Sequence, residues 1–262
     1  MRALSASELL AVWERGQASS AVQQALILLA AASPDAPPET LAKLSVGRRD
    51  ARLLELREEL FGSRLLALAG CPQCGQQIEL SFETAEIRAD ADSAPPDNLT
   101  ISSGHYIAEF RLVNSEDLAA VADLTGEQAG VAAATQMLLS RCLLKVRLKG
   151  RRQTVARPGD LPPALVATIA EEMEKADPQA NVQLDLVCGD CGHRWLSPFD
   201  IVSFLWTEID SWARRLLREV CLLASVFGWR EADILAMSPE RRSLYLEMMS
   251  KTVVTQIHCG ET

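Results

Sequence analysis

The sequence predicts an α+β fold that is mainly α-helical, with a small antiparallel sheet joined by a split four-cysteine site and flanked by N- and C-terminal helical regions. Three observations support this fold class. Apolar residues recur at helical spacing over both ends of the chain, and short segments in the middle alternate between apolar and polar residues. Two Cys-x-x-Cys-Gly motifs, at residues 71–75 and 188–192, each adjoin one of these alternating segments.

The composition is that of a protein that binds other proteins. The 262 residues are 48% hydrophobic, enough for one large domain or two small ones. A net charge of −9 disfavours nonspecific binding to nucleic acid or to anionic membranes. The first residues indicate a capped helix rather than a secretory signal, and no uninterrupted apolar run approaches the ~18 residues of a membrane span. We therefore expect a cytoplasmic protein whose seven cysteines are ligands or free thiols, not disulfides.

Residues 1–70 are predicted to form an N-terminal helical region. Its helical segments are expected over about residues 5–16, 19–32, 41–44 and 47–62. Ser5 and Glu8 form a capping box at the first segment, and Gly16 ends it. The last segment carries a strongly periodic leucine stripe that Gly62 closes, and an apolar stretch then leads into the first cysteine motif.

Residues 71–196 are predicted to form a split zinc-ribbon-like β region with an inserted hairpin and inserted helices. Strands are expected at 76–83, 99–101, 106–112 and 181–187, a loop at 89–98, and helices at 116–125, 127–149 and 163–177. Ser115 is expected to cap the first of these helices. Because each cysteine motif adjoins one alternating strand, we expect strands 76–83 and 181–187 to pair with one another.

Residues 197–251 are predicted to form a C-terminal helical region, and residues 252–262 a tail without a clear pattern. The first helix is expected to start at Ser197 and to end at Gly228. A short helix at 231–236 and a last helix capped by Ser238 follow.

The two cysteine motifs predict a structural metal site formed by Cys71, Cys74, Cys188 and Cys191. Four thiolates complete the tetrahedral coordination of Zn²⁺ and leave no position for a substrate. Iron is the alternative metal. The 113 residues from 75 to 187 exceed the ~15–20 of a compact zinc ribbon, so a chance double match is the alternative interpretation. His193 is interpreted as a neighbour of this site or a surface group rather than a fifth candidate ligand.

The remaining cysteines do not indicate catalysis. Cys142 and Cys221 are interpreted as small buried hydrophobes at helical core positions. Cys259 follows His258, but nothing in the sequence supplies an orienting group or an oxyanion hole, so a thiol enzyme is the least favoured hypothesis. We expect that the protein is not an enzyme.

Two charged segments and one aromatic group allow more than one interpretation. Residues 47–50, Gly-Arg-Arg-Asp, stand before a helix and suit an internal ion pair or a contact with a partner better than a phosphate site, because Asp50 would repel the anion. The basic run from Lys145 to Arg152 is interpreted as a solvated face or docking patch, with nucleic-acid binding as the alternative. The tryptophans at 206, 212 and 229 are expected in the core rather than at an interface.

Several motifs together resemble a known family. In the first half of the chain these are the Arg-Asp pair that opens the leucine-rich helix at 47–62, the Cys-Pro-x-Cys motif after it, and Phe110-Arg111-Leu112 leading into Ser115-x-Asp117-Leu118. In the second half they are the second cysteine motif and Ala232-Asp233-Ile234-Leu235 with Glu240-Arg241-Arg242 and Tyr245-Leu246. The chain resembles baseplate proteins of contractile-tailed phages and of related contractile injection systems.

The resemblance implies an assembly role. A member of this family is expected to be a baseplate or baseplate-hub assembly factor, a chaperone or a minor structural component, and to bind hub, spike or wedge proteins. The alternative hypothesis, from a different class, is a zinc-ribbon nucleic-acid-binding adaptor that uses the basic run from 145 to 152.

Overall fold

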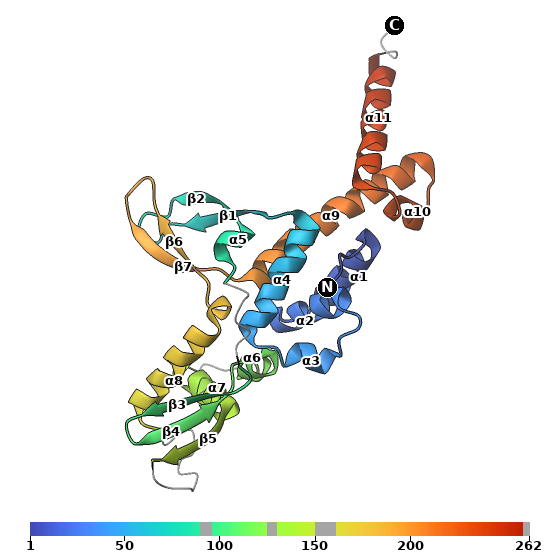
Figure 1. The fold of residues 1–262 in the computed structure, drawn as a ribbon. Coiled ribbons are helices and arrows are strands. Elements are labelled where there is room, and N and C mark those ends of the chain that lie inside the picture. The colour runs from blue at the N-terminus through green and yellow to red at the C-terminus, as the bar shows by residue number, and fades with distance from the viewer. Residues whose placement is uncertain (90–95, 125–129, 150–160, 259–262) are drawn as a thin grey trace.

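The computed structural model describes residues 1–89, 96–124, 130–149 and 161–258, with side chains as far as residue 249. The fold is α+β and mainly helical, as predicted (Figure 1). A central helical body carries a pair of β-hairpins, a lobe with a three-stranded sheet, and a C-terminal arm that projects away from the rest (Figure 1). None of the described helices has the length and apolarity needed to cross a membrane.

The central body combines helices from both ends of the chain. It contains α1 (Ala6–Gly16), α2 (Ala21–Ala32), α3 (Pro38–Ala42), α4 (Val46–Phe61) and the first half of α9 (Ile201–Phe227). Leu28, Leu53 and Leu205 are fully buried in its core. The predicted capping box of Ser5 and Glu8 is present at α1.

Polar contacts join α9 to the N-terminal helices. Trp13 Nε1 of α1 donates to Asp210 Oδ1 at 2.9 Å, and Arg57 of α4 pairs with Glu208 through contacts of 2.7 and 2.9 Å. Segments about 150 residues apart in the sequence thus form a single core.

The cysteine motifs lie at the turns of two separate hairpins. The first is β1 (Arg64–Gly70) with β2 (Gln77–Glu83), followed by α5 (Thr84–Ile87), and the second is β6 (Gln183–Val187) with β7 (Arg194–Pro198). The prediction that strands 76–83 and 181–187 pair is therefore wrong. Each strand pairs with its neighbour across the short cysteine turn, because closing a short loop costs less conformational entropy than closing a long one.

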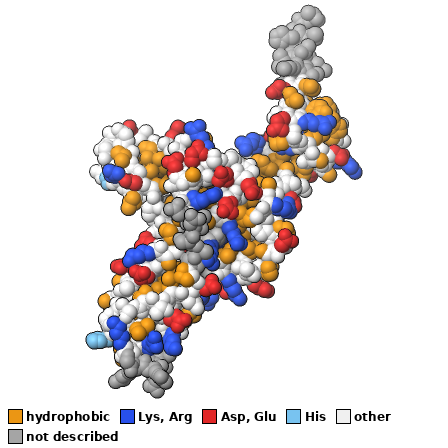
Figure 2. Space-filling model, in the orientation of Figure 1, with side chains coloured by type: hydrophobic (Ala, Val, Ile, Leu, Met, Phe, Trp, Pro, Cys, Tyr) orange, Lys and Arg blue, Asp and Glu red, His pale blue; other side chains and the backbone are white. Residues whose placement is uncertain are grey.

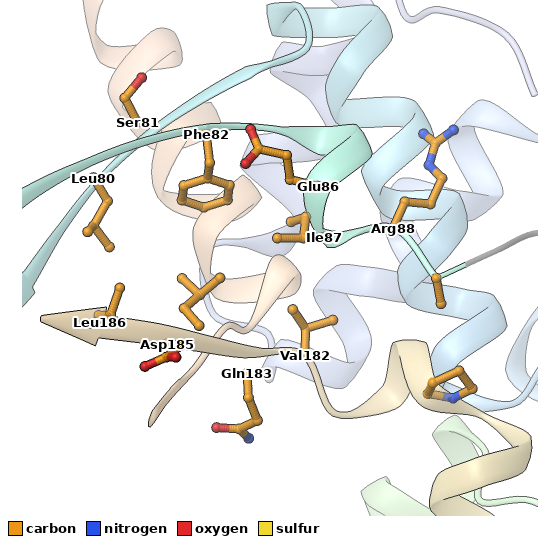
Figure 3. A pocket seen from close by; sticks show the side chains of 13 residues that line it. Leu80, Ser81, Phe82, Glu86, Ile87, Arg88, Val182, Gln183, Asp185 and Leu186 are labelled. Atoms are coloured by element: carbon orange, nitrogen blue, oxygen red, sulfur yellow. The ribbon is translucent and has the colours of Figure 1, made fainter. Parts of the chain in front are cut away.

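The two hairpins face each other across a partly open space with a volume of about 510 Å³. Leu80 and Phe82 point from β2 toward β6, and Leu186 points back, whereas Gln183 and Asp185 point away (Figure 3). The expected alternation of both strands is thus confirmed, and their apolar sides face each other across this space instead of pairing edge to edge.

The lobe contains a sheet of strand order β3-β4-β5. Its elements are β3 (Leu99–Ser103), β4 (Tyr106–Phe110), α6 (Ser115–Ala122), α7 (Val131–Cys142), β5 (Leu143–Leu148), α8 (Pro163–Ala176) and the 3₁₀ turn η2 (Pro178–Ala180). The predicted hairpin at 99–112 and the helix at 163–177 are confirmed. Phe110 and Ile169 are fully buried between the sheet and the helices that cover it.

Two sequence predictions in the lobe are corrected. The helix expected over 127–149 ends at Cys142, and the following residues form β5, because Val146 is buried opposite Ala108 of β4 while its neighbours point outward. The cap of α6 is Asn114 rather than Ser115, and its side chain accepts from the backbone N–H of Asp117. Part of the loop expected at 89–98, and the first residues of the helix expected at 127, lie outside the described residues.

The C-terminal arm consists of the second half of α9 with α10 (Glu231–Leu235) and α11 (Pro239–His258). Leu216, Leu223 and Ile234 form its small core. The start of α9 differs from the prediction, because residues 194–198 form β7 and Asp200 caps the helix. The predicted end at Gly228 is confirmed, with φ of 68°.

Candidate metal centre

The two cysteine turns bring four sulfur atoms together. The Sγ atoms of Cys71 and Cys191 are 3.7 Å apart, as are those of Cys74 and Cys188, and all four lie within 4.8 Å of one another. Four thiolates each ~2.3 Å from a tetrahedral metal ion would be separated by ~3.8 Å. The cluster therefore has the donor set and the dimensions of a site that could hold a metal ion.

Backbone hydrogen bonds and glycine conformations shape both turns in the same way. The N–H of Gly75 donates to the carbonyl of Cys71 at 2.9 Å, and that of Gly192 to the carbonyl of Cys188 at 3.0 Å. Both glycines have positive φ, 77° and 71°, a region that other residues rarely adopt. The glycine after each second cysteine is thus explained by the turn it forms.

The protonation of the thiols also suits a cation. The pKa of Cys71 is lowered to about 7: burial opposes ionisation, but backbone N–H groups of Cys74 and Gln73 outweigh it. At Cys74 the backbone hydrogen bond involving Gln76 favours the thiolate, yet the neighbouring thiols prevail and raise its pKa to about 12. Without a cation the four sulfurs cannot all be ionised, whereas a bound divalent ion would favour four thiolates.

Two of the four thiols face solvent. Cys71 and Cys188 are buried, while Cys74 and Cys191 are exposed. The ring of His193 stacks on Trp195 with a centroid distance of 5.9 Å, so its contacts are with the hairpin beside the cluster. A metal ion bound by all four sulfurs would have no open position for catalysis.

Residues 47–50 form an internal ion pair, as predicted. Arg49 Nε lies 2.7 Å from Asp50 Oδ1, and both side chains are largely buried. The backbone N–H of Gly47 donates to Asp177 Oδ2 at 2.9 Å, so a carboxylate of the same chain occupies the N-terminus of α4. A Cβ at Gly47 would lie 2.1 Å from Asp177 Oδ1. No local pattern in the sequence points to this contact, because Asp177 is 130 residues from Gly47.

The cysteines outside the cluster differ in how well the structure agrees with their predicted burial. Cys142 is fully buried, as predicted, and burial raises the pKa of its thiol to about 12. The prediction for Cys221 is wrong, since this residue is exposed. The buried stripe of α9 passes through Val220 and Leu223, and Cys221 lies beside it. Cys259 lies outside the described residues.

The tryptophans and the basic run have defined positions. Trp206 and Trp212 are half-buried against the central core, and Trp229 packs in the C-terminal arm. The first part of the basic run lies on β5 and just after it rather than on a helix. Its residues 150–152 are outside the described part of the chain.

The fold and the cluster define an α+β, mainly helical protein in which four cysteines from two hairpins far apart in the sequence lie close together. Residues 5–206 match the family model described as T4 bacteriophage base plate protein, and the chain belongs to this family. The match runs from α1 into α9 and includes both cysteine motifs. The comparisons with curated proteins and with solved structures found no match. The family match confirms the resemblance to phage baseplate proteins noted in the sequence.

Proposed function

We propose that this protein is a non-enzymatic assembly factor or chaperone, or a minor structural component, for the baseplate of a contractile phage tail or contractile injection system. It acts in the cytoplasm by binding hub, spike or wedge proteins of the same system. The observation that carries this proposal is the baseplate family match over residues 5–206. The acidic composition also favours proteins rather than nucleic acid as partners.

The C-terminal arm offers a surface for such a partner. Leu222 and Val226 are 51% and 58% exposed one turn apart on α9, and Leu244 and Met248 are 55% and 58% exposed one turn apart on α11. The arm projects from the body, and hydrophobic side chains gather on its visible face (Figure 2). Pairs of large apolar side chains at helical spacing favour burial against another protein.

The test is affinity purification of the tagged protein from cells that express the surrounding tail gene cluster, with the co-purified proteins identified by mass spectrometry. The proposal expects hub, spike or wedge proteins, in amounts reduced by the double variant Leu222→Ser/Val226→Ser. Val131→Ser is the control, because Val131 is an exposed apolar residue of α7, which belongs to the lobe and not to the arm. Recovery of no baseplate protein by the unmodified chain would contradict the proposal.

We also propose that Cys71, Cys74, Cys188 and Cys191 bind a structural Zn²⁺ ion. Support comes from the four converging sulfurs and from the separate pairing of the two hairpins, whose β2 and β6 belong to different sheets. A metal ion would fasten these hairpins, and its binding free energy, on the order of 10 kcal/mol in small zinc peptides, would stabilise the fold.

The metal proposal is tested by elemental analysis of the purified protein and by substitution with Co²⁺, whose visible spectrum reports tetrahedral thiolate ligands. We expect a stoichiometric amount of zinc in the unmodified protein and in Cys221→Ser, and loss of zinc in Cys71→Ser. Cys221 is a suitable control because it is an exposed thiol on α9, outside the cluster. Iron in stoichiometric amount, or equal zinc in both variants, would contradict the assignment.

A further inference from the structure

Strand β5 presents a row of positive charge along a sheet edge. Lys145 and Arg147 are exposed on alternate positions of the strand, and Lys149 follows at the same spacing. In Figure 2 several Lys and Arg side chains lie on the lobe that contains this sheet. In the strand order β3-β4-β5, one side of β5 pairs with β4, and its other side pairs with no described strand.

The charges on this row are not neutralised by ion pairs within the described part of the chain. Glu109 is the cross-strand neighbour of Lys145, and Ile107 that of Arg147. No carboxylate oxygen of the described residues lies within 4.0 Å of the charged groups of Lys145, Arg147 and Lys149. Arg141, which precedes β5 in the sequence, differs from them because it pairs with buried Asp117. The row therefore stands out in a chain whose net charge is −9.

Charged side chains on edge strands also protect against edge-to-edge aggregation. That role explains why two copies of this chain would not pair through β5, since the two basic rows would repel each other. The same arrangement favours a strand of opposite charge. Positions two residues apart along a strand are separated by about 6.8 Å, so alternate acidic side chains on a paired strand would lie opposite the basic row.

We propose that the free edge of β5 binds an extended acidic segment of a partner protein, which adds a strand to the β3-β4-β5 sheet and pairs its carboxylates with Lys145, Arg147 and Lys149. The inference specifies a partner contact for the assembly role and rests on that proposed function. A protein strand is favoured over nucleic acid, because only a polypeptide offers backbone N–H and C=O groups to a sheet edge.

The test measures binding of a fluorescein-labelled peptide of alternating Glu and Val to the full chain by fluorescence anisotropy. The double variant Lys145→Glu/Arg147→Glu is compared with Arg15→Glu/Lys43→Glu, which makes the same change in net charge at exposed residues of the central body. We expect the β5 variant to weaken binding by about tenfold or more and the control to change it far less. Far-UV circular dichroism checks that both variants are folded.

Two further probes separate the possible modes of binding. A peptide with N-methylated amides at alternate residues cannot donate to the sheet edge, and we expect it to bind at least about tenfold more weakly. Equal binding of that peptide, equal losses in the two double variants, or tighter binding of a labelled single-stranded oligonucleotide would each overturn the inference.

The affinity purification distinguishes failure of this inference from failure of the proposed function. If Lys145→Glu/Arg147→Glu recovers baseplate proteins as well as the unmodified chain does, the β5 contact is wrong and the assembly role stands. If the unmodified chain recovers none, the assembly role fails whatever the peptide does.

Discussion

The carboxylate of Asp117 joins three elements of the lobe and is the clearest target for mutation. Its side chain is fully buried in α6. It accepts from Arg111 Nη1 at 2.6 Å and Nη2 at 2.9 Å, from Arg141 Nε at 2.8 Å, and from the backbone N–H of Asn114 at 3.1 Å. Arg111 follows β4 and Arg141 lies in the last turn of α7. The carboxylate of Asp117 therefore holds the end of β4 and the end of α7 against α6.

The substitution Asp117→Asn keeps the shape of the side chain and removes its charge. Two guanidinium groups then face a neutral amide, and breaking a fully buried ion pair costs about 3–5 kcal/mol. The Arg111 and Arg141 side chains are 27% and 37% exposed, so water compensates part of the loss. We therefore expect the free energy of unfolding of the lobe to fall by about 2 kcal/mol.

The pKa of Asp117 leads to the same magnitude. Burial acts to raise it, but the hydrogen bonds from Arg111 outweigh burial and lower it to about 2. The difference from the ordinary value of 3.8 corresponds to about 2 kcal/mol. Because the folded pKa is depressed, this stabilisation is present above about pH 4 and is lost as the pH falls toward 2.

Hydrogen exchange in a urea series is the appropriate assay, because it resolves the lobe. Tryptophan fluorescence would miss it, since the five tryptophans are at positions 13, 195, 206, 212 and 229. Glu116→Gln, a change at the exposed neighbouring position, is the control. A free energy of unfolding for Asp117→Asn within about 0.5 kcal/mol of that control at pH 7 would contradict a stabilising ion pair at Asp117. So would a difference between Asp117→Asn and the unmodified protein that persists unchanged at pH 3.

Three further outcomes are expected. Gly47→Ala should lower the free energy of unfolding in urea by about 2 kcal/mol, because the added Cβ would displace Asp177 from the N-terminus of α4. Gly70→Ala should cost far less, because a Cβ at Gly70 meets no atom within 4 Å. Equal effects of the two substitutions would contradict the close packing at Gly47. Leu205→Ala should cost about 2–5 kcal/mol and Leu222→Ala less than about 1 kcal/mol, and similar values would be inconsistent with the assigned core. Chelation with EDTA should increase hydrogen exchange in the β1–β2 and β6–β7 hairpins while the central body stays protected, and no change in the hairpins would argue against a structural metal.

Local signals in the sequence were sufficient for much of the fold. The capping box at Ser5 and Glu8, the positive-φ glycine Gly228 and the alternation over 77–83 each act within a few residues, so the sequence pattern contains the physical cause. The four cysteines could likewise be found by spacing, although they come from segments more than a hundred residues apart.

The features that the sequence did not predict depend on tertiary contacts. Strand β1 carries Leu and Ala on both its faces, so its sequence shows no alternation of apolar and polar residues, although Leu65 is buried and Leu66 and Leu68 are exposed. Strand β5 follows α7 without a break, and only its pairing with β4 ends the helix at Cys142. Asp177 reaches the start of α4 through a hydrogen bond across 130 residues, which no local pattern reveals.

The proposed role of the protein in building a baseplate is tested most directly by deleting its gene from the tail gene cluster and imaging the resulting particles by electron microscopy. We expect assembled baseplates to be missing from the deletion strain and to return when the gene is supplied in trans. Complete baseplates and contractile tails of normal number in the deletion strain would contradict the proposed assembly role.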